Sequence, residues 1–333
     1  MTRFSTIRRC LAQIFIVAVC STAFALSAQA ADALRLRLEA IAEGYHAHFF
    51  LGVERGYYRD EGIDLTIAEG QGSVNVLKLI SEGSDVIGRA DYGTMAKAVG
   101  QGLAVKAIFG EMQDSPICII SRADAPIKTP AEMAGKLIAM APVESSAQLF
   151  PILLTASKVD PKSLNVVNPA VGAKNVLLLQ KRVDAIAGYS NIHPAQLKSG
   201  GLDTVYFRFA DYGVGTLSNG LVANVKFLAE KPDLIKRFLR ATVRSYQEAM
   251  KHPDEAVDIM LKQYPIRAKE REVYIGMLKD TFPLLHTKNN DGHPIGWMAE
   301  ADWAKTQDIL IETGAIAAKL PLDRYYTNDF VPR

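Results

Sequence analysis

One short stretch near the N-terminus constrains the fold most, because its hydrophobic pattern changes period twice. Residues 34–41 alternate apolar and polar side chains, which predicts a β-strand. From Gly44 onward the apolar residues fall at helical spacing, until Gly56 and Gly62 end the run. Residues 63–67 alternate again and predict a second strand. Strand, glycine turn, short helix and strand together indicate an open α/β sheet.

The turn after the first strand holds the first candidate site residues, since ligands bind beyond the carboxyl ends of strands in open α/β sheets. Tyr45, His46 and His48 lie there, in a turn predicted to expose them. A phenol ring offers apolar area and imidazoles offer hydrogen bonds, which suits a small, flat or anionic ligand. The alternative is that they cap and pack the helix. Two histidines at i and i+2 do not define a metal site, so we expect no metal.

Two later strand-end loops supply further candidates in the first half. The turn at 70–73 contains Gln71 and Ser73 and opens a helix, where backbone N–H groups favour anions or polar ligand atoms. It lacks the spacing of a nucleotide motif. Asp91 and Tyr92 occupy the next such loop, and Asp91 could equally cap the following helix. Either turn can also be a plain strand-to-helix connection.

The second half repeats this arrangement of strands that end in polar loops. Serines after the strand at 136–140 either bind ligand or cap a helix that runs to about residue 156. A loop after a short strand near residue 186 adds an aromatic ring, an amide and an imidazole. A later tryptophan either lines the cleft or packs in the core. The candidates here are Ser145, Ser146, Tyr189, Asn191, His193, Asn219 and Trp297.

The first thirty residues read as a secretory signal peptide. They begin with three arginines, continue with a mainly apolar run at 11–26, and end in small residues that place cleavage near Ala30. A membrane anchor fits less well, because the apolar run is short and interrupted. Cys20 raises lipidation as an alternative, but Val19 stands where such sites usually have a small residue. We therefore expect an exported protein that begins at Ala31.

Removal of this segment changes both the charge and the cysteine content. It holds three of the 38 Lys and Arg residues and none of the 36 Asp and Glu residues, so the mature chain carries about −1. Such a balance gives no nucleic-acid-binding surface. Of three cysteines only Cys118 remains, within the apolar run 116–120. A lone cysteine forms no internal disulfide, and we expect it in the core.

Several segments resemble a known family. Residues 52–73 read GVERGYYRDEGIDLTIAEGQGS, residues 127–136 read IKTPAEMAGK, a Val-Asp-Ala begins at Val183, and residues 211–214 read DYGV. Together they resemble the periplasmic solute-binding proteins of ABC importers in the SsuA/THI5-like (NMT1) class, which serves nitrate, sulfonates, taurine and thiamine pyrimidines. The resemblance covers most of the mature chain.

The resemblance implies an α/β, two-lobed periplasmic-binding-protein fold of type II, with two hinge crossings and a helical C-terminal part. We expect a signal peptide at 1–30, lobe 1 at 31–120 and 219–333, and lobe 2 at 121–218. Gly213, Gly215 and Gly220 supply flexible backbone near the second crossing. The resemblance further implies a periplasmic monomer without a cofactor, which delivers its solute to an ABC permease and ATPase.

The sequence favours one class of solute but does not identify the solute. The segment Asp211–Val214 favours the thiamine-pyrimidine-precursor branch. Those carriers place an acid just before the asparagine of the loop near residue 190, whereas this chain has Ser190, which leaves room for another aromatic or heterocyclic solute. The alternative is a sulfonate, taurine or nitrate, held by Arg89 and the turn at 70–73.

Two further function classes remain as alternatives. Related pyrimidine synthases use a cysteine-rich motif that this chain lacks, and no G-x-S-x-G or H-E-x-x-H occurs, so we expect no catalytic residues. A periplasmic sensor or adaptor could use the same two-lobed clamp without transport.

Overall fold

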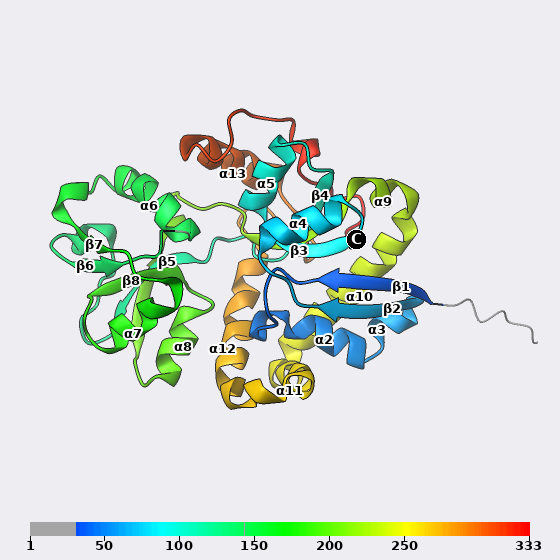
Figure 1. Cartoon of the computed structure of the whole chain (residues 1–333), viewed down its shortest axis with the longest axis horizontal. Helices are drawn as coiled ribbons and strands as arrows, with labels where there is room; N and C mark the ends of the chain where they lie inside the picture. The colour runs from blue at the N-terminus through cyan, green and yellow to red at the C-terminus, as the bar shows by residue number, and fades with distance from the viewer. Residues whose placement is uncertain (1–30, 143) are drawn as a thin grey trace, which may run out of the picture.

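The computed structural model describes residues 31–142 and 144–333, so the expected signal peptide lies outside the described residues. The chain forms two five-stranded sheets (Figure 1). Lobe 1 contains the sheet β2-β1-β3-β10-β4, and lobe 2 the sheet β7-β6-β8-β5-β9. The lobe 1 strands are β1 (Asp32–Arg37), β2 (Ile63–Ala68), β3 (Ile87–Asp91), β4 (Val105–Gly110) and β10 (Asn219–Asn224). Those of lobe 2 are β5 (Ile117–Arg122), β6 (Leu137–Ala139), β7 (Asn165–Val167), β8 (Ala185–Tyr189) and β9 (Thr204–Arg208).

The chain passes between the lobes twice. The first crossing, residues 111–116, joins β4 to β5, and the second, residues 209–218, joins β9 to β10. Each strand that follows a crossing runs antiparallel to both of its neighbours, whereas β1 pairs in parallel with β2 and β3. The predicted α/β, two-lobed fold with two crossings is confirmed. The predicted boundaries between the lobes, at residues 120 and 218, stay predictions.

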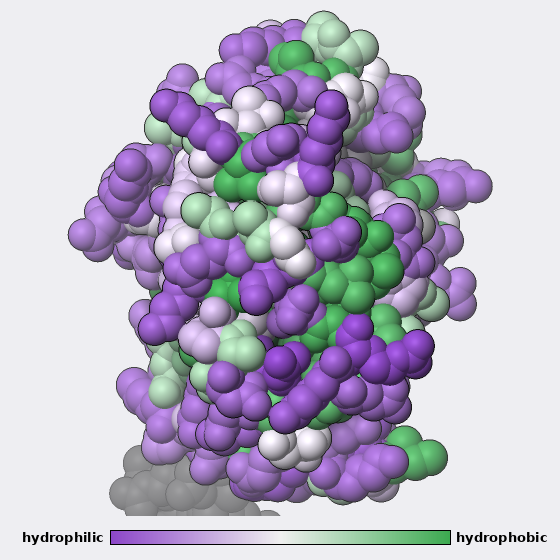
Figure 2. Space-filling view, turned by 90° about the vertical axis from the view of Figure 1, so that its left-hand side faces the viewer, coloured by the Kyte–Doolittle hydropathy of each residue, from purple (hydrophilic) through white to green (hydrophobic). Residues whose placement is uncertain are grey.

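Helices cover both sheets, and most of the C-terminal third is helical. Lobe 1 carries α2 (Ala47–Glu54), α3 (Tyr57–Asp60), α4 (Ser73–Ser81) and α5 (Tyr92–Gly100), and lobe 2 carries α6 (Ser145–Ala156), α7 (Lys174–Leu179) and α8 (His193–Ser199). The C-terminal part adds α9 (Val225–Glu230), α10 (Pro232–Lys251), α11 (Pro253–Gln263), α12 (Arg271–Thr281) and α13 (Glu300–Glu312). In Figure 1, α12 stands between the two lobes. The outer end of lobe 2 is mostly hydrophilic, with an apolar area on one side (Figure 2).

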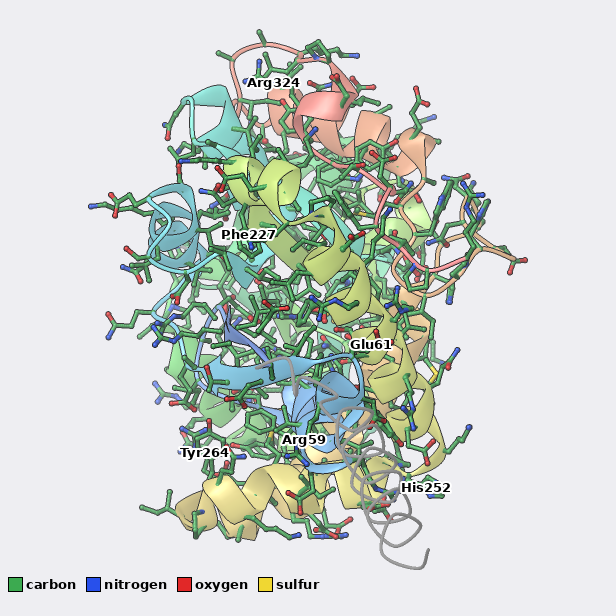
Figure 3. All side chains as sticks on the ribbon, turned by 90° about the vertical axis from the view of Figure 1, so that its right-hand side faces the viewer. Arg59, Glu61, Phe227, His252, Tyr264 and Arg324 are labelled. Carbon is green, nitrogen blue, oxygen red and sulfur yellow. The ribbon has the colours of Figure 1, made fainter. Side chains whose placement is uncertain are left out.

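Helix α10 packs on lobe 1 through its apolar face. Its apolar residues recur at helical spacing and are buried, among them Ile235, Phe238 and Leu239. The opposite face carries arginines, and Arg240 pairs with the carboxylate of Glu61 at 2.6 Å. Figure 3 shows Glu61 beside this helix. Such half-exposed pairs stabilise by less than about 1 kcal/mol each, so the buried apolar face holds α10 in place.

The stretch that opened the sequence analysis folds in the predicted order, but its first strand ends at Arg37 instead of residue 41, and its turn is buried. The strand β1, the 3-10 turn Gly44–His46, helix α2 and strand β2 follow in order, and β1 pairs with β2. The prediction that the turn exposes its side chains is wrong, because Tyr45, His46 and His48 are all buried. Helix α12 packs against the turn, and a Cβ on Gly44 would collide with the backbone of Tyr274.

The second crossing corrects the predicted role of one glycine. Gly213 has a φ of +83°, a conformation that favours glycine. Gly220 instead lies within β10, where a Cβ would collide with the hydroxyl of Tyr92. Its function is therefore close packing rather than flexibility. Arg208, at the end of β9, pairs with Asp114 of the first crossing and with Asp211 of the second, and so ties the two crossings together.

Candidate functional site

A cavity of about 210 Å³ lies between the two lobes. Both lobes and both crossings contribute to its wall. Its lining consists of Glu39, Tyr45, Asp91, Thr94, Met112, Pro116, Ile117, Ser145, Tyr189, Asn191, Ile192, Thr216, Ser218 and Asn219. The volume is below the usual range of roughly 300–1,000 Å³ for small-molecule sites, which favours a small solute in this conformation.

The cavity brings together candidates that lie far apart in the sequence. Six of the predicted residues line it: Tyr45, Asp91, Ser145, Tyr189, Asn191 and Asn219. They end or follow strands β1, β3, β6 and β8, or begin β10, so most lie at the strand ends that the sequence rule pointed to. Tyr45 comes from lobe 1 and Tyr189 from lobe 2, so the cavity has a phenol ring on each side. That these residues contact a solute stays a prediction.

The other candidates lie outside the cavity lining: His46, His48, Gln71, Ser73, Tyr92, Ser146, His193 and Trp297. Gln71 is exposed, and Tyr92 is in the core, where its hydroxyl donates to the carbonyl of Phe109 at 2.7 Å. Ser146 is buried beside Glu144. Trp297 stacks on His293 in the C-terminal segment, with ring centroids 3.7 Å apart.

Two of the candidates outside the lining, His193 and Ser73, each bond to a residue that lines the cavity. His193 accepts a hydrogen bond of 3.0 Å at Nδ1 from the backbone of Tyr189. Burial, with a contribution from Lys174, lowers the pKa of His193 to about 4, so the ring is neutral. Helix α4 begins at Ser73, and Gly72 occupies its N-cap position. The Oγ of Ser73 accepts a 3.0 Å hydrogen bond from the backbone of Asp91.

A buried ionic cluster lies behind the lobe 1 wall. Arg89 donates through Nη1 to Glu39 and through Nε to Glu111. His46 Nε2 lies 3.2 Å from Oε2 of Glu39, and His48 Nε2 lies 3.4 Å from Oε1 of Glu111. Burial alone would raise the pKa of Glu39, but Arg89 and His46 outweigh it and lower the pKa to about 2. Glu39 is therefore ionised where it lines the cavity.

The cluster corrects the expected role of Arg89 as an anion receptor. Arg89 is buried, and its one positive charge is shared by two carboxylates. The turn at 70–73 is also occupied, because Gly70 and Gly72 donate their N–H groups to the carbonyls of Ala40 and Glu39. Arg89 is therefore not free to meet an anionic solute, and no residue of the turn at 70–73 is part of the cavity lining.

The carboxylate of Asp91 caps helix α5, as one of its two predicted roles required, and Asp91 also lines the cavity. Oδ1 caps helix α5 by accepting from the backbone and the hydroxyl of Thr94, at 2.7 and 2.8 Å. No described residue donates to Oδ2. Burial raises the pKa of Asp91, although the bonds from Thr94 oppose this shift.

The lobe 2 wall presents a second acceptor. Asn191 is buried, and its Nδ2 donates to Oγ1 of Thr281 at 3.0 Å. That hydroxyl donates its only proton to the carbonyl of Met277 at 2.8 Å, so it must accept from the amide, and this fixes the amide orientation. Oδ1 of Asn191 is then a buried acceptor without a partner among the described residues.

The sequence reasoning missed eight lining residues: Glu39, Thr94, Met112, Pro116, Ile117, Ile192, Thr216 and Ser218. Glu39 follows β1, so the strand-end rule that selected Tyr45 applies to it as well. Thr216 and Ser218 belong to the second crossing, and only the path of that crossing reveals them. Within residues 31–142 and 144–333, no three His, Cys, Asp or Glu side chains group as metal ligands would. None of the helices in that part of the chain has the length and apolar character to cross a bilayer.

A family model described as "NMT1/THI5 like" matches residues 43–256. The chain belongs to the NMT1/THI5-like family. This chain is 23% identical to the riboflavin-binding protein RibY of Chloroflexus aurantiacus over 86% of its own length and 82% of that protein. It is 22% identical to the formylaminopyrimidine-binding protein of Halalkalibacterium halodurans, over 91% of this chain and 92% of that protein. A 4-amino-5-hydroxymethyl-2-methylpyrimidine phosphate synthase of Legionella pneumophila is also 22% identical, over 86% of this chain and 89% of the synthase.

The fold of this NMT1/THI5-like chain matches that of solved binding proteins. It resembles the periplasmic aliphatic sulphonate-binding protein SsuA from Escherichia coli with a TM-score of 0.67, at 15% identity, over 88% of this chain and 91% of that structure. At this identity the likeness establishes the two-lobed periplasmic-binding-protein fold and no ligand.

Proposed function

We propose that this chain is the solute-binding protein of an ABC importer and captures a small aromatic or heterocyclic solute between its lobes. The cavity carries the proposal, because Tyr45 and Tyr189 line it from opposite lobes together with neutral polar groups. Aromatic rings with a few placed polar groups are typical of sites for flat solutes. A solute that touches both lobes stabilises the conformation in which they approach each other.

The relatives support this solute class. Two proteins similar to this chain over most of their length are named for binding riboflavin and a formylaminopyrimidine, and both solutes are nitrogen heterocycles. The alternative is an aliphatic sulfonate, taurine or nitrate. Among the described lining residues there is no lysine or arginine, and the two charged ones, Glu39 and Asp91, are acidic. An anionic solute would have to overcome this repulsion, so the heterocycle is preferred.

We propose binding without chemistry, although the family includes a named synthase. Cys118, expected in the core, is buried in β5, and burial raises the pKa of its thiol, so it is a poor nucleophile. Recovery of the bound solute unchanged after incubation, checked by mass spectrometry, tests this. Conversion of the solute by the purified protein would overturn it.

The proposal also includes the location, the oligomeric state and the partners of the protein. The protein acts as a monomer in the periplasm after removal of residues 1–30, and an ABC permease with its ATPase receives the solute. Periplasmic fractionation tests the location. Loss of solute uptake on deletion of the chain tests transport, whereas normal uptake would favour the sensor or adaptor alternative.

A thermal-shift screen of residues 31–333 tests the solute class. Riboflavin, 4-amino-5-hydroxymethyl-2-methylpyrimidine, ethanesulfonate and nitrate serve as probes, because a bound solute raises the melting temperature by mass action. We expect a heterocycle to give the largest shift. Tyr45→Ala and Tyr189→Ala should then each weaken that solute by about tenfold or more in calorimetry. Tyr206→Ala is the matched control, since this tyrosine is 47% exposed on lobe 2 outside the cavity.

A further inference from the structure

We propose that the cavity selects its solute by N–H donors, which Asp91 Oδ2 accepts from lobe 1 and Asn191 Oδ1 accepts from lobe 2. The inference rests on the proposed function and deepens it. The solute class is an amino-substituted, neutral or cationic nitrogen heterocycle that has donors on two sides. Asp91 and Asn191 are then the specificity-determining residues.

The first support is that the carboxylate of Asp91 is fixed in position while its Oδ2 accepts no hydrogen bond from the described residues. Asp91 Oδ1 receives the two hydrogen bonds from Thr94, and the backbone N–H of Asp91 is bound by Ser73. These three bonds fix the carboxylate at the cavity wall. Oδ2 receives no hydrogen bond from any described residue, and Asp91 is half-buried at the wall of the cavity. A carboxylate oxygen that is partly removed from water is stabilised by a donor, which a solute in the cavity can supply.

The second support is independent and comes from the other lobe. Asn191 cannot rotate its amide to satisfy Oδ1, because Nδ2 is needed by Thr281. Oδ1 is one of the few buried side-chain acceptors that have no partner in the described part of the chain. An amide oxygen held in this way accepts a hydrogen bond and cannot give one. It therefore discriminates against solutes that present only acceptors, such as sulfonates.

The charges of the lobe 1 wall also favour a solute that carries N–H donors. Glu39 lines the cavity as a carboxylate whose pKa is lowered to about 2, and Arg89 behind it is shared with Glu111. No lysine or arginine among the described residues balances Asp91 at the cavity. A ring that carries an amino group brings partial or full positive charge to this wall, which strengthens the hydrogen bond to Asp91.

The two acceptors also couple recognition to closure. Because Asp91 ends β3 of lobe 1 and Asn191 follows β8 of lobe 2, one solute that donates to both holds the lobes together. A solute with a single donor satisfies one lobe and leaves the other acceptor buried without a partner. The structure thus assigns selectivity to the number and placement of donors rather than to ring size alone.

The test compares two isosteric rings by calorimetry on the purified protein. 4-Aminopyrimidine carries the donors, and 4-methylpyrimidine replaces the amino group with a methyl group of similar size. We expect the wild type to prefer the amino compound by about tenfold or more, the scale of a hydrogen bond to a charged group. Asp91→Asn keeps an oxygen for Thr94 but turns the second position into a donor, and it should reduce the preference to less than about threefold.

Asp160→Asn is the matched control, because Asp160 caps a short helix in lobe 2 through the N–H of Lys162 at 2.9 Å and lies outside the cavity. It should keep the wild-type preference. Equal wild-type affinity for both rings, or an unchanged preference in Asp91→Asn, overturns the inference while binding of either ring leaves the proposed function standing. Binding of ethanesulfonate alone, or of none of the probes including riboflavin, overturns the proposed solute class together with the inference.

Discussion

Asn191 and Thr281 are joined by a hydrogen bond of 3.0 Å from Nδ2 to Oγ1, which links lobe 2 to helix α12 beside lobe 1. Both side chains are buried. Since Asn191 also lines the cavity, one side chain belongs to the candidate site and to the contact between the lobes. The orientation of its amide therefore depends on the position of α12.

Thr281→Val tests this relationship. Valine keeps the shape but removes the acceptor, so the amide of Asn191 loses its fixed orientation and a buried donor loses its partner. We expect the free energy of unfolding to fall by about 1–3 kcal/mol. The affinity for the best heterocycle of the screen should fall by about threefold to tenfold. Urea unfolding and calorimetry measure the two effects.

Thr242→Val separates the effect on binding from a loss of stability. Thr242 is also a buried threonine whose hydroxyl donates one turn back, to Phe238 at 2.9 Å, but it lies outside the cavity lining. The Thr242→Val variant should be less stable than the wild type but bind the heterocycle with the same affinity. Wild-type affinity in Thr281→Val would show that binding does not depend on the hydrogen bond between Asn191 and Thr281.

Arg89→Met tests the buried cluster. The variant leaves Glu39 and Glu111 without their shared cation, and removal of one partner from a buried ion pair costs about 3–5 kcal/mol. Burial opposes the ionisation of Glu39, but Arg89 and His46 lower its pKa from 4.5 to about 2, so the stability it contributes is present above pH 4.5 and is lost as pH falls toward 2. We expect the deficit of the variant to be largest at pH 7 and to shrink in that window.

Urea midpoints at several pH values measure this deficit. Arg244→Met is the control, because Arg244 pairs with Asp60 on the surface at 2.9 Å and should change stability by less than about 1 kcal/mol. Equal losses in the two variants, or a deficit independent of pH, would contradict the role given to the cluster.

The local pattern was enough to predict the elements that depend on neighbouring residues. The alternation at 34–41 and 63–67 predicted β1 and β2, although β1 ends at Arg37. Side-chain period and glycine position are properties of a short segment, so they are readable without knowledge of the fold. The strand-end rule then pointed to five of the six candidates that line the cavity, whereas Asn219 lies at the start of β10.

Burial of charge was not predictable, because it depends on distant partners. Arg89 was considered as a residue that could hold an anionic solute, yet it lies inside β3, where Glu39 and Glu111 pair with it. His48 was expected at the surface, but Tyr246, almost 200 positions later in the sequence, stacks on it at 3.7 Å. An isolated Arg or His normally indicates solvent, and only the tertiary structure supplies the partners that reverse this expectation.

His193 gives a prediction for the pH dependence of stability. Burial and Lys174 lower its pKa in the folded protein to about 4, against an ordinary value of 6.5. The unfolded chain therefore binds a proton first as pH falls, and stability is lost between pH 6.5 and 4. His193→Gln should remove up to about 3 kcal/mol of this loss. Urea unfolding between pH 4 and 7 measures it, with the exposed His252→Gln as control; an unchanged slope in His193→Gln would refute the assignment.

Gly276 on α12 sets how closely the lobes approach, because a Cβ there would lie 3.0 Å from the Cβ of Ala195 on α8 of lobe 2. Gly276→Leu places a large side chain in this contact and should hold the lobes apart, so that no solute touches both walls. We expect affinity to fall by about tenfold or more and the radius of gyration from X-ray scattering with solute to exceed that of the wild type. Gly100→Leu, at an open position in α5, should behave as the wild type does. Closure and binding retained in Gly276→Leu would mean that the α8–α12 contact does not limit the movement of the lobes.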